Sequence, residues 1–86
     1  MKTDLPTPKI LIVDDTPANL FAMRKLLAQI DAELVTVTSG NEALALCLDE
    51  RFALILLDVN MPEMDGYEVA ALLANEPLNR DTPVIF

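Results

Sequence analysis

Short apolar runs alternate with longer helical patterns along this chain, and this alternation limits the fold more than any other feature. Strands are expected at residues 10–13, 34–38, 53–57 and 84–86, and helices at residues 17–30, 41–50 and 66–74. A strand-helix-strand order favours a parallel sheet with helices packed on its faces. The 86 residues therefore predict one α/β domain over residues 9–86, preceded by a flexible leader at residues 1–8.

The apolar content of each strand predicts its place in the sheet. Residues 10–13 and 53–57 are apolar throughout, as in strands covered on both faces, whereas residues 34–38 alternate apolar with polar side chains. The first and third strands should therefore be central and the second should lie at an edge. Right-handed crossovers then give a doubly wound parallel sheet in the order second, first, third, fourth. Ligands of such sheets bind beyond the carboxyl ends of the strands, where the winding reverses.

Several residues mark the ends and the buried faces of the expected helices. Thr16 can cap the first helix with Pro17 at its first position, Ser39 and Glu42 form the pattern of a capping box, and Pro77 follows the third helix. An apolar stripe on the first helix is expected to enter the core. The stripe consists of Leu20, Phe21, Met23, Leu26, Leu27 and Ile30.

Charge and composition exclude several classes of function. Fourteen acidic residues against six basic ones give a net charge of −8, which repels nucleic acid and anionic membranes. No apolar run approaches the roughly 20 residues that span a bilayer, and no apolar signal core opens the chain. The single cysteine, Cys47, lies in the apolar pattern of the second helix and is expected to be buried. These features predict a cytoplasmic location.

Aspartates follow the two strands that are expected to be central. Asp14 and Asp15 come directly after the first strand, and Asp58 comes directly after the third. Each taken alone also fits a helix cap or a solvated loop. Their coincidence at the point where the winding reverses favours a functional site, since crowded ionisable groups concentrate at such sites. Because the chain has no histidine, oxygen ligands must hold any metal, which favours Mg²⁺ over Mn²⁺ or Ca²⁺.

The sequence around these aspartates resembles the receiver domain of bacterial two-component response regulators. The resemblance rests on Ile12-Val13-Asp14-Asp15 and on the run LLDVNMPEMDGYE at residues 56–68, and it extends over residues 9–86. It implies a flavodoxin-like receiver fold, here with four strands and three helices. It also implies that Asp58 accepts a phosphoryl group.

The same resemblance implies a Mg²⁺ site and a partner. Asp14, Asp15 and Asp58 would hold the ion together with the backbone carbonyl of Asn60, while Pro62 and Gly66 shape the loop. The phosphoryl donor would be a phosphohistidine on a histidine kinase or a histidine phosphotransfer protein. The domain would be a regulator rather than an enzyme, with at most self-phosphorylation and self-dephosphorylation.

Two surfaces are candidates for partner contact. In this family the first helix helps to recognise the kinase, which makes Asn19 and Arg24 candidates on it. Met61, Met64 and Tyr67 flank the loop after the third strand, and we expect them to pack onto the domain rather than to dock a partner.

The resemblance stops at Phe86, inside the fourth strand. A hydroxyl residue after that strand and a lysine after a fifth strand, both present in the family, are absent from residues 1–86. We therefore expect an incomplete receiver domain, a fragment of a longer protein. Its apolar edge at residues 84–86 should make the chain unstable or lead to self-association.

Two other functions stay open. The chain can be an interaction module that has kept the fold and lost phosphotransfer. Alternatively, Asp58-Val59-Asn60 faintly resembles the D-x-D loop of haloacid-dehalogenase-like phosphatases, which use Mg²⁺ and an aspartyl-phosphate. Asn60 stands where those enzymes have the second aspartate, which protonates the leaving group, and this replacement argues against turnover.

Overall fold

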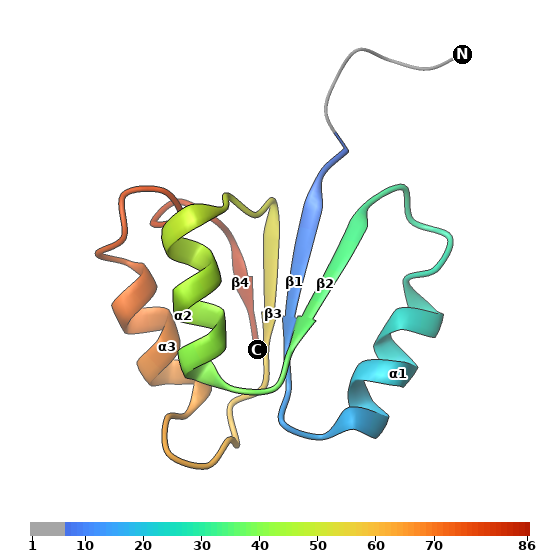
Figure 1. Cartoon of the computed structure of the whole chain (residues 1–86), viewed down its shortest axis with the longest axis horizontal. Coiled ribbons are helices and arrows are strands. Elements are labelled where there is room, and N and C mark those ends of the chain that lie inside the picture. Colours follow the sequence, from blue (N-terminus) through green and yellow to red (C-terminus); the bar gives the residue numbers. More distant parts are fainter. Residues whose placement is uncertain (1–6) are drawn as a thin grey trace.

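A four-stranded parallel sheet carries helices on both of its faces (Figure 1). The structure is a computed structural model that describes residues 7–86, so most of the predicted leader lies outside the described residues. Its elements are β1 (Lys9–Val13), α1 (Pro17–Leu26), β2 (Glu33–Val37), α2 (Gly40–Asp49), β3 (Leu54–Leu57), α3 (Gly66–Leu73) and β4 (Val84–Ile85). The predicted fold class and the predicted elements are confirmed, with boundary differences described below.

The sheet has the predicted order β2-β1-β3-β4. Every adjacent pair is parallel, and Val13 of β1 is level with Val37 of β2 and Leu57 of β3. The carboxyl ends of these strands therefore lie together, at the lower edge of the sheet in Figure 1. This register brings the loops that follow β1 and β3 side by side.

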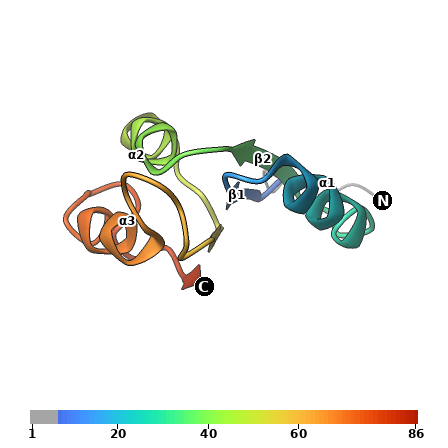
Figure 2. The ribbon, with the colours of Figure 1, turned by 90° about the horizontal axis from the view of Figure 1, so that it is seen from below.

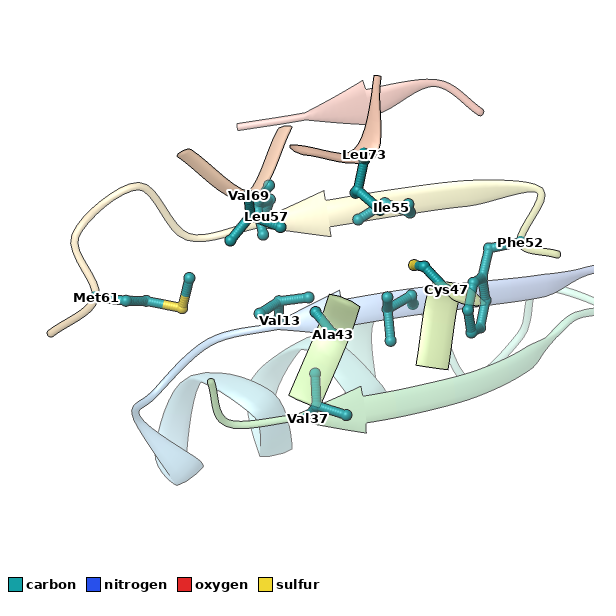
Figure 3. Close-up of a cluster of buried hydrophobic side chains, with 11 residues drawn as sticks. Val13, Val37, Ala43, Cys47, Phe52, Ile55, Leu57, Met61, Val69 and Leu73 are labelled. Atoms are coloured by element: carbon teal, nitrogen blue, oxygen red, sulfur yellow. The ribbon is translucent and has the colours of Figure 1, made fainter. Parts of the chain in front are cut away.

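Alternate side chains of the strands build two separate cores. Figure 2 shows α1 well apart from α2 and α3, and Figure 3 shows the larger core, which the sheet forms with α2 and α3. The larger core consists of Leu11, Val13, Val37, Ala43, Cys47, Phe52, Ile55, Leu57, Met61, Val69 and Leu73. The smaller core lies on the other face, where Ile10, Ile12 and Leu20 pack together.

Cys47 is fully buried in the larger core, as predicted. Burial raises the pKa of its thiol to about 11, and the nearby carboxylates of Glu76 and Glu50 act in the same direction. The thiol is therefore protonated at neutral pH and contributes as a small apolar side chain.

The first helix ends at Leu26, and the prediction that it runs to residue 30 is wrong. A helix over residues 17–30 would be about 21 Å long, whereas a strand of five residues spans about 17 Å. The chain must also reverse direction to enter β2 at Glu33. Turns closed by hydrogen bonds from Ile30 N–H to the Leu27 carbonyl (3.0 Å) and from Ala32 N–H to the Ile30 carbonyl (2.9 Å) make this reversal.

The predicted apolar stripe of α1 is only partly buried. Leu20 is buried, and Met23 and Leu27 pack against it. Phe21, Leu26 and Ile30 are 64%, 76% and 50% exposed, so their assignment to the core was wrong. The reason is that α1 touches one face of the sheet along a narrow seam, and Ile30 lies beyond the helix end.

The helix starts agree with the predicted caps in position but differ in their hydrogen bonds. Thr16 is the N-cap of α1 without a side-chain capping bond. The Ser39 hydroxyl accepts from Glu42 N–H (3.1 Å), but the Glu42 carboxylate accepts from Thr38 N–H rather than from Ser39 N–H. Hydrogen bonds from Thr38 and Ser39 lower the pKa of Glu42.

A complete capping box opens α3, where sequence reasoning had not placed one. The Asp65 carboxylate accepts from Glu68 N–H (2.9 Å), and the Glu68 carboxylate accepts from Asp65 N–H (3.2 Å). The α3 helix therefore starts at a well-defined residue, eight positions after Asp58.

Over residues 7–86, no helix is both long and apolar enough to cross a membrane.

Candidate functional site

The loops after β1 and β3 bring the side chains of Asp14, Asp15 and Asp58 together. One carboxylate oxygen of each lies within 4.8 Å of the others, and all three side chains are half-buried. Backbone hydrogen bonds fix this arrangement, because Asp14 N–H donates to the Val37 carbonyl (3.2 Å) and Asp58 N–H donates to the Val13 carbonyl (2.9 Å). The aspartates thus sit where the parallel ladders end.

Asp14 is the most heavily hydrogen-bonded of the three carboxylates. Its Oδ1 accepts from Thr16 N–H (2.9 Å), and the Asn19 amide Nδ2 donates to both Oδ1 (3.3 Å) and Oδ2 (3.1 Å). Asn19 lies in the first turns of α1, so the helix itself holds the carboxylate. These bonds limit how Asp14 can rotate.

Asp58 is held by the loop that follows it. Asn60 N–H donates to Asp58 Oδ1 (3.1 Å), and Gly66 N–H donates to the Val59 carbonyl (3.3 Å). A Cβ at Gly66 would lie 2.6 Å from the Asp58 carbonyl oxygen and 2.9 Å from Val59 Cα. Only glycine therefore allows the start of α3 to approach the end of β3 this closely.

The loop between Asp58 and α3 contains a tight turn. Met64 N–H donates to the Pro62 carbonyl (2.7 Å), and Glu63 between them has φ 70°, the only positive φ of a non-glycine residue within residues 7–86. A bond between residues two apart with a central positive φ is a rare, strained γ-turn. Strain of this kind concentrates in functional loops.

The residues that flank this loop differ in burial. Met61 is buried and Met64 packs against the larger core, as predicted. Tyr67 does not pack into the domain, because it is 63% exposed, and its ring lies 4.8 Å from that of Phe86. The prediction of packing is therefore wrong for Tyr67. The helical period of α3 explains this, since Gly66, Val69 and Leu73 occupy the buried face.

A pocket of ≈ 270 Å³ opens beside the carboxylates, on the face of the sheet that α1 covers in part. Asp14 and Asp58 form its polar wall. Ile12, Met23, Leu56, Ile85 and Phe86 contribute apolar side chains to it. The carboxylates therefore border both solvent and an apolar surface.

The carboxylate set fits a hard divalent cation. Three anionic groups this close repel one another unless a positive charge is shared between them. Oxygen ligands alone, with room for water and phosphate oxygens, are the set that Mg²⁺ prefers. Asp14, Asp15 and Asp58 can supply that set.

Sequence reasoning missed what Asn19 and Arg24 do within the chain. The sequence predicts both as candidates for partner contact, and both are exposed. Asn19 also holds Asp14, and Arg24 donates to Thr36 Oγ1 (3.2 Å), which ties α1 to the edge strand β2. The helix start at Pro17 was the available signal for Asn19, since it places that side chain one turn from the Asp14 loop. A role in partner contact stays a prediction for both residues.

Comparison with known proteins supports the resemblance to receiver domains. The family model of the response regulator receiver domain matches residues 10–86. The chain is 48% identical over 59 residues to the sensor protein GacS of Pseudomonas syringae pv. syringae, a match that covers 69% of this chain and 6% of GacS.

Solved receiver structures are similar over most of the chain. The chemotaxis protein CheY4 of Vibrio cholerae is 33% identical with a TM-score of 0.85, and the match covers 92% of this chain and 66% of CheY4. A second similar structure is the receiver domain of a Pseudomonas aeruginosa sensor histidine kinase, solved with magnesium coordinated in its active site cleft. It is 25% identical with a TM-score of 0.85, and the match covers 92% of this chain and 65% of that domain's chain.

The chain thus spans less than two thirds of the length of each of these three proteins. The family match, however, covers nearly all of its residues and includes all three clustered aspartates. This chain belongs to the response regulator receiver domain family of two-component systems.

Proposed function

We propose that Asp58 accepts a phosphoryl group and that Asp14, Asp15, Asp58 and the Asn60 carbonyl hold the Mg²⁺ that the reaction requires. The observation that carries the proposal is the approach of the carboxylates of Asp14, Asp15 and Asp58 to within 4.8 Å of one another at the carboxyl ends of the central strands. A crystal structure of a relative that holds magnesium in its active site cleft supports the metal assignment.

The transfer forms one bond and breaks one. A carboxylate oxygen of Asp58 attacks the phosphorus of a phosphohistidine, an O–P bond forms, and the P–N bond breaks with its electron pair left on the histidine nitrogen. Bound Mg²⁺ would neutralise charge on the phosphoryl oxygens and carboxylates. Asn60 N–H donates to Oδ1 of Asp58, which orients the carboxylate and leaves Oδ2 without a hydrogen-bond partner within residues 7–86.

The phosphoryl group cannot come from a histidine within residues 1–86, because they contain none. We propose a histidine kinase or a histidine phosphotransfer protein. GacS, which is similar to this chain, is a sensor protein, which supports a place in such a relay. The exposed Phe21 of α1, two residues after the Asn19 that holds Asp14, is an apolar side chain available to the donor. We do not expect direct binding of nucleic acid or membranes, since the net charge is −8.

Incubation with acetyl phosphate and Mg²⁺ tests the proposal. Intact-mass spectrometry should show one added phosphoryl group per chain, labile to hydroxylamine as an acyl phosphate is. Asp58→Asn should abolish the adduct and Asp14→Asn should slow its formation, whereas Asp31→Asn, at an exposed carboxylate after α1, should leave it unchanged.

The same reaction separates the alternatives. Release of phosphate over many turnovers would mean a phosphatase. No adduct with wild-type chain, from either acetyl phosphate or a phosphorylated donor, would mean an interaction module without phosphotransfer, and the proposal would fail.

Two further expectations accompany the proposed function. Ile85 of β4 and Phe86 directly after it are 53% and 57% exposed, so we propose that the chain self-associates through this edge, which sedimentation velocity would detect. We also propose a cytoplasmic location, in keeping with a single buried thiol at Cys47, which cell fractionation would check.

A further inference from the structure

An apolar groove runs between α2 and α3 on the side that faces away from the sheet. We call it the α2–α3 groove. It has a volume of ≈ 430 Å³ and is lined by Leu44, Ala45, Leu48, Leu72, Asn75 and Glu76. Leu48 is 60% exposed and Leu72 is 46% exposed, although both belong to helices whose other faces are fully buried. The groove is lined from the middle of α2 and from the carboxyl end of α3 onward. Figure 1 shows that α2 and α3 begin at the edge of the sheet where the strands end and run away from it, and the aspartates follow those strand ends.

The helix ends beside the groove carry negative charge. Both α2 and α3 follow strands of a parallel sheet and run in the same direction, so their carboxyl ends lie at the same end of the molecule (Figure 1). A helix carboxyl end bears about half a negative charge and favours nearby cations. Neither helix has a basic residue in its last turn.

Carboxylates add to this charge. Glu76 lines the groove, and Asp49 ends α2 one turn after Ala45, on the same side of the helix. Glu50 is paired with Lys9 (2.8 Å), but within residues 7–86 neither Asp49 nor Glu76 forms an ion pair. Arg51 and Arg80 are the nearest basic residues in sequence, and neither lies on the groove wall. Apolar walls and an unneutralised acidic end therefore meet in one surface.

We propose that the α2–α3 groove docks an amphipathic helix of a partner protein, with leucine-sized side chains on one face and lysine or arginine beside them. The apolar side chains would cover Leu48 and Leu72, and the cations would approach Asp49, Glu76 and the two helix ends. This mode of recognition places an amphipathic helix in an apolar groove. A second copy of the chain is a poorer occupant, because it brings the same negative charge, and an anionic membrane is repelled for the same reason.

A pair of labelled peptides tests this docking. The probe is a fluorescein-labelled helical peptide with leucines on one face and lysines elsewhere, and its matched control carries glutamate in place of every lysine. Fluorescence anisotropy with the 86-residue chain in Mg²⁺ should show binding of the lysine peptide that weakens as salt is added, and none of the glutamate peptide.

Variants locate the contact. The double variant Leu48→Ser with Leu72→Ser should weaken binding about tenfold or more. The free energy of fully burying even one leucine side chain corresponds to a change in affinity of at least this size. Asp49→Lys should weaken it as well, through charge alone. Leu26→Ser on α1, at a leucine that is 76% exposed, is the matched control and should have no effect. Circular dichroism would establish that each variant is folded, which the exposure of these side chains favours.

Any one of four results would overturn the proposal. Equal binding of the two peptides would exclude charge recognition, and equal weakening by Leu26→Ser would exclude the groove. Loss of binding in Asp14→Asn with Asp58→Asn, but not in the groove variants, would assign the peptide to the aspartate cluster. If Leu48→Ser with Leu72→Ser instead dissolves a dimer of the wild-type chain, the occupant is a second copy.

Discussion

Asn19 shows how one side chain links α1 to the aspartate cluster. Its amide donates to both carboxylate oxygens of Asp14, so it acts on the proposed metal site through a ligand rather than as one. Partners that orient metal ligands in this way are worth about 10–100-fold in metal affinity.

Asn19→Ala should therefore weaken Mg²⁺ binding by about tenfold, because Asp14 loses the group that orients it. Isothermal titration calorimetry measures the affinity. Asn41→Ala is the matched control, since Asn41 is an exposed asparagine of α2, and it should bind Mg²⁺ as the wild type does. Equal affinities in both variants would mean that Asn19 does not position Asp14.

Asn79 is a second residue whose effect depends on its hydrogen bonds. It is the only buried polar residue in the core of residues 7–86. Its Oδ1 accepts from Phe52 N–H (2.9 Å) and Thr82 Oγ1 (3.1 Å), and its Nδ2 donates to the carbonyls of Cys47 (2.8 Å) and Glu50 (2.7 Å). One amide thus joins the end of α2, the start of β3 and the segment before β4.

Asn79→Ala should lower the free energy of unfolding by about 2–4 kcal/mol, because it leaves several buried backbone groups without partners. Urea denaturation followed by circular dichroism measures this. Asn75→Ala, at an exposed asparagine after α3, should change stability little. A small effect of Asn79→Ala would show that water replaces the amide.

At the scale of elements, the site depends on how closely α3 approaches the end of β3. The capping box of Asp65 and Glu68 sets where α3 begins, and Gly66 at its first position touches the backbone of Asp58 and Val59. The loop between them is closed by the turn at Glu63. The helix start therefore sets the position of the Asp58 backbone.

Gly66→Ala should slow phosphorylation of Asp58 and destabilise the chain by about 1–3 kcal/mol, the usual cost of overpacking. The added Cβ meets backbone atoms that cannot rotate away. Gly40→Ala is the useful comparison, because its Cβ would meet the end of the Val69 side chain (2.7 Å) and the Met64 sulfur (3.2 Å), away from Asp58. Acetyl phosphate kinetics and thermal melts should show loss of stability in both but slower phosphorylation only in Gly66→Ala.

At the scale of the whole molecule, the acidic site opposes folding and a bound cation would reverse that effect. The chain has a net charge of −8, and its clustered carboxylates repel one another when no cation is bound. A ligand that binds only the folded state stabilises it in proportion to the logarithm of its concentration.

Mg²⁺ at about 100 times its dissociation constant should stabilise the chain by ~2.7 kcal/mol. Thermal melts with Mg²⁺ and with EDTA measure the difference. Asp58→Asn should melt at a higher temperature than the wild type in EDTA, because repulsion is relieved, and should gain less from Mg²⁺. An equal gain in both proteins would place the ion outside the aspartate cluster.

The sequence was sufficient for the strand order and for the place of the aspartates. Apolar runs on central strands and alternation on the edge strand follow from which faces are covered, so the order β2-β1-β3-β4 was predictable. Asp14, Asp15 and Asp58 follow those strands directly, and parallel strands in register must bring them to one edge. Local pattern decides both features, and tertiary packing does not override it.

Other features of the molecule could be known only from the tertiary structure. The length of the sheet that α1 covers determines that the helix ends at Leu26. The packing of helix faces against the strands determines that Phe21, Leu26 and Tyr67 are exposed. Asn79 is distant in sequence from the backbone groups it joins. The α2–α3 groove likewise depends on two helices packing side by side. Such features arise from contacts between distant segments, for which the period of side chains along one segment holds no signal.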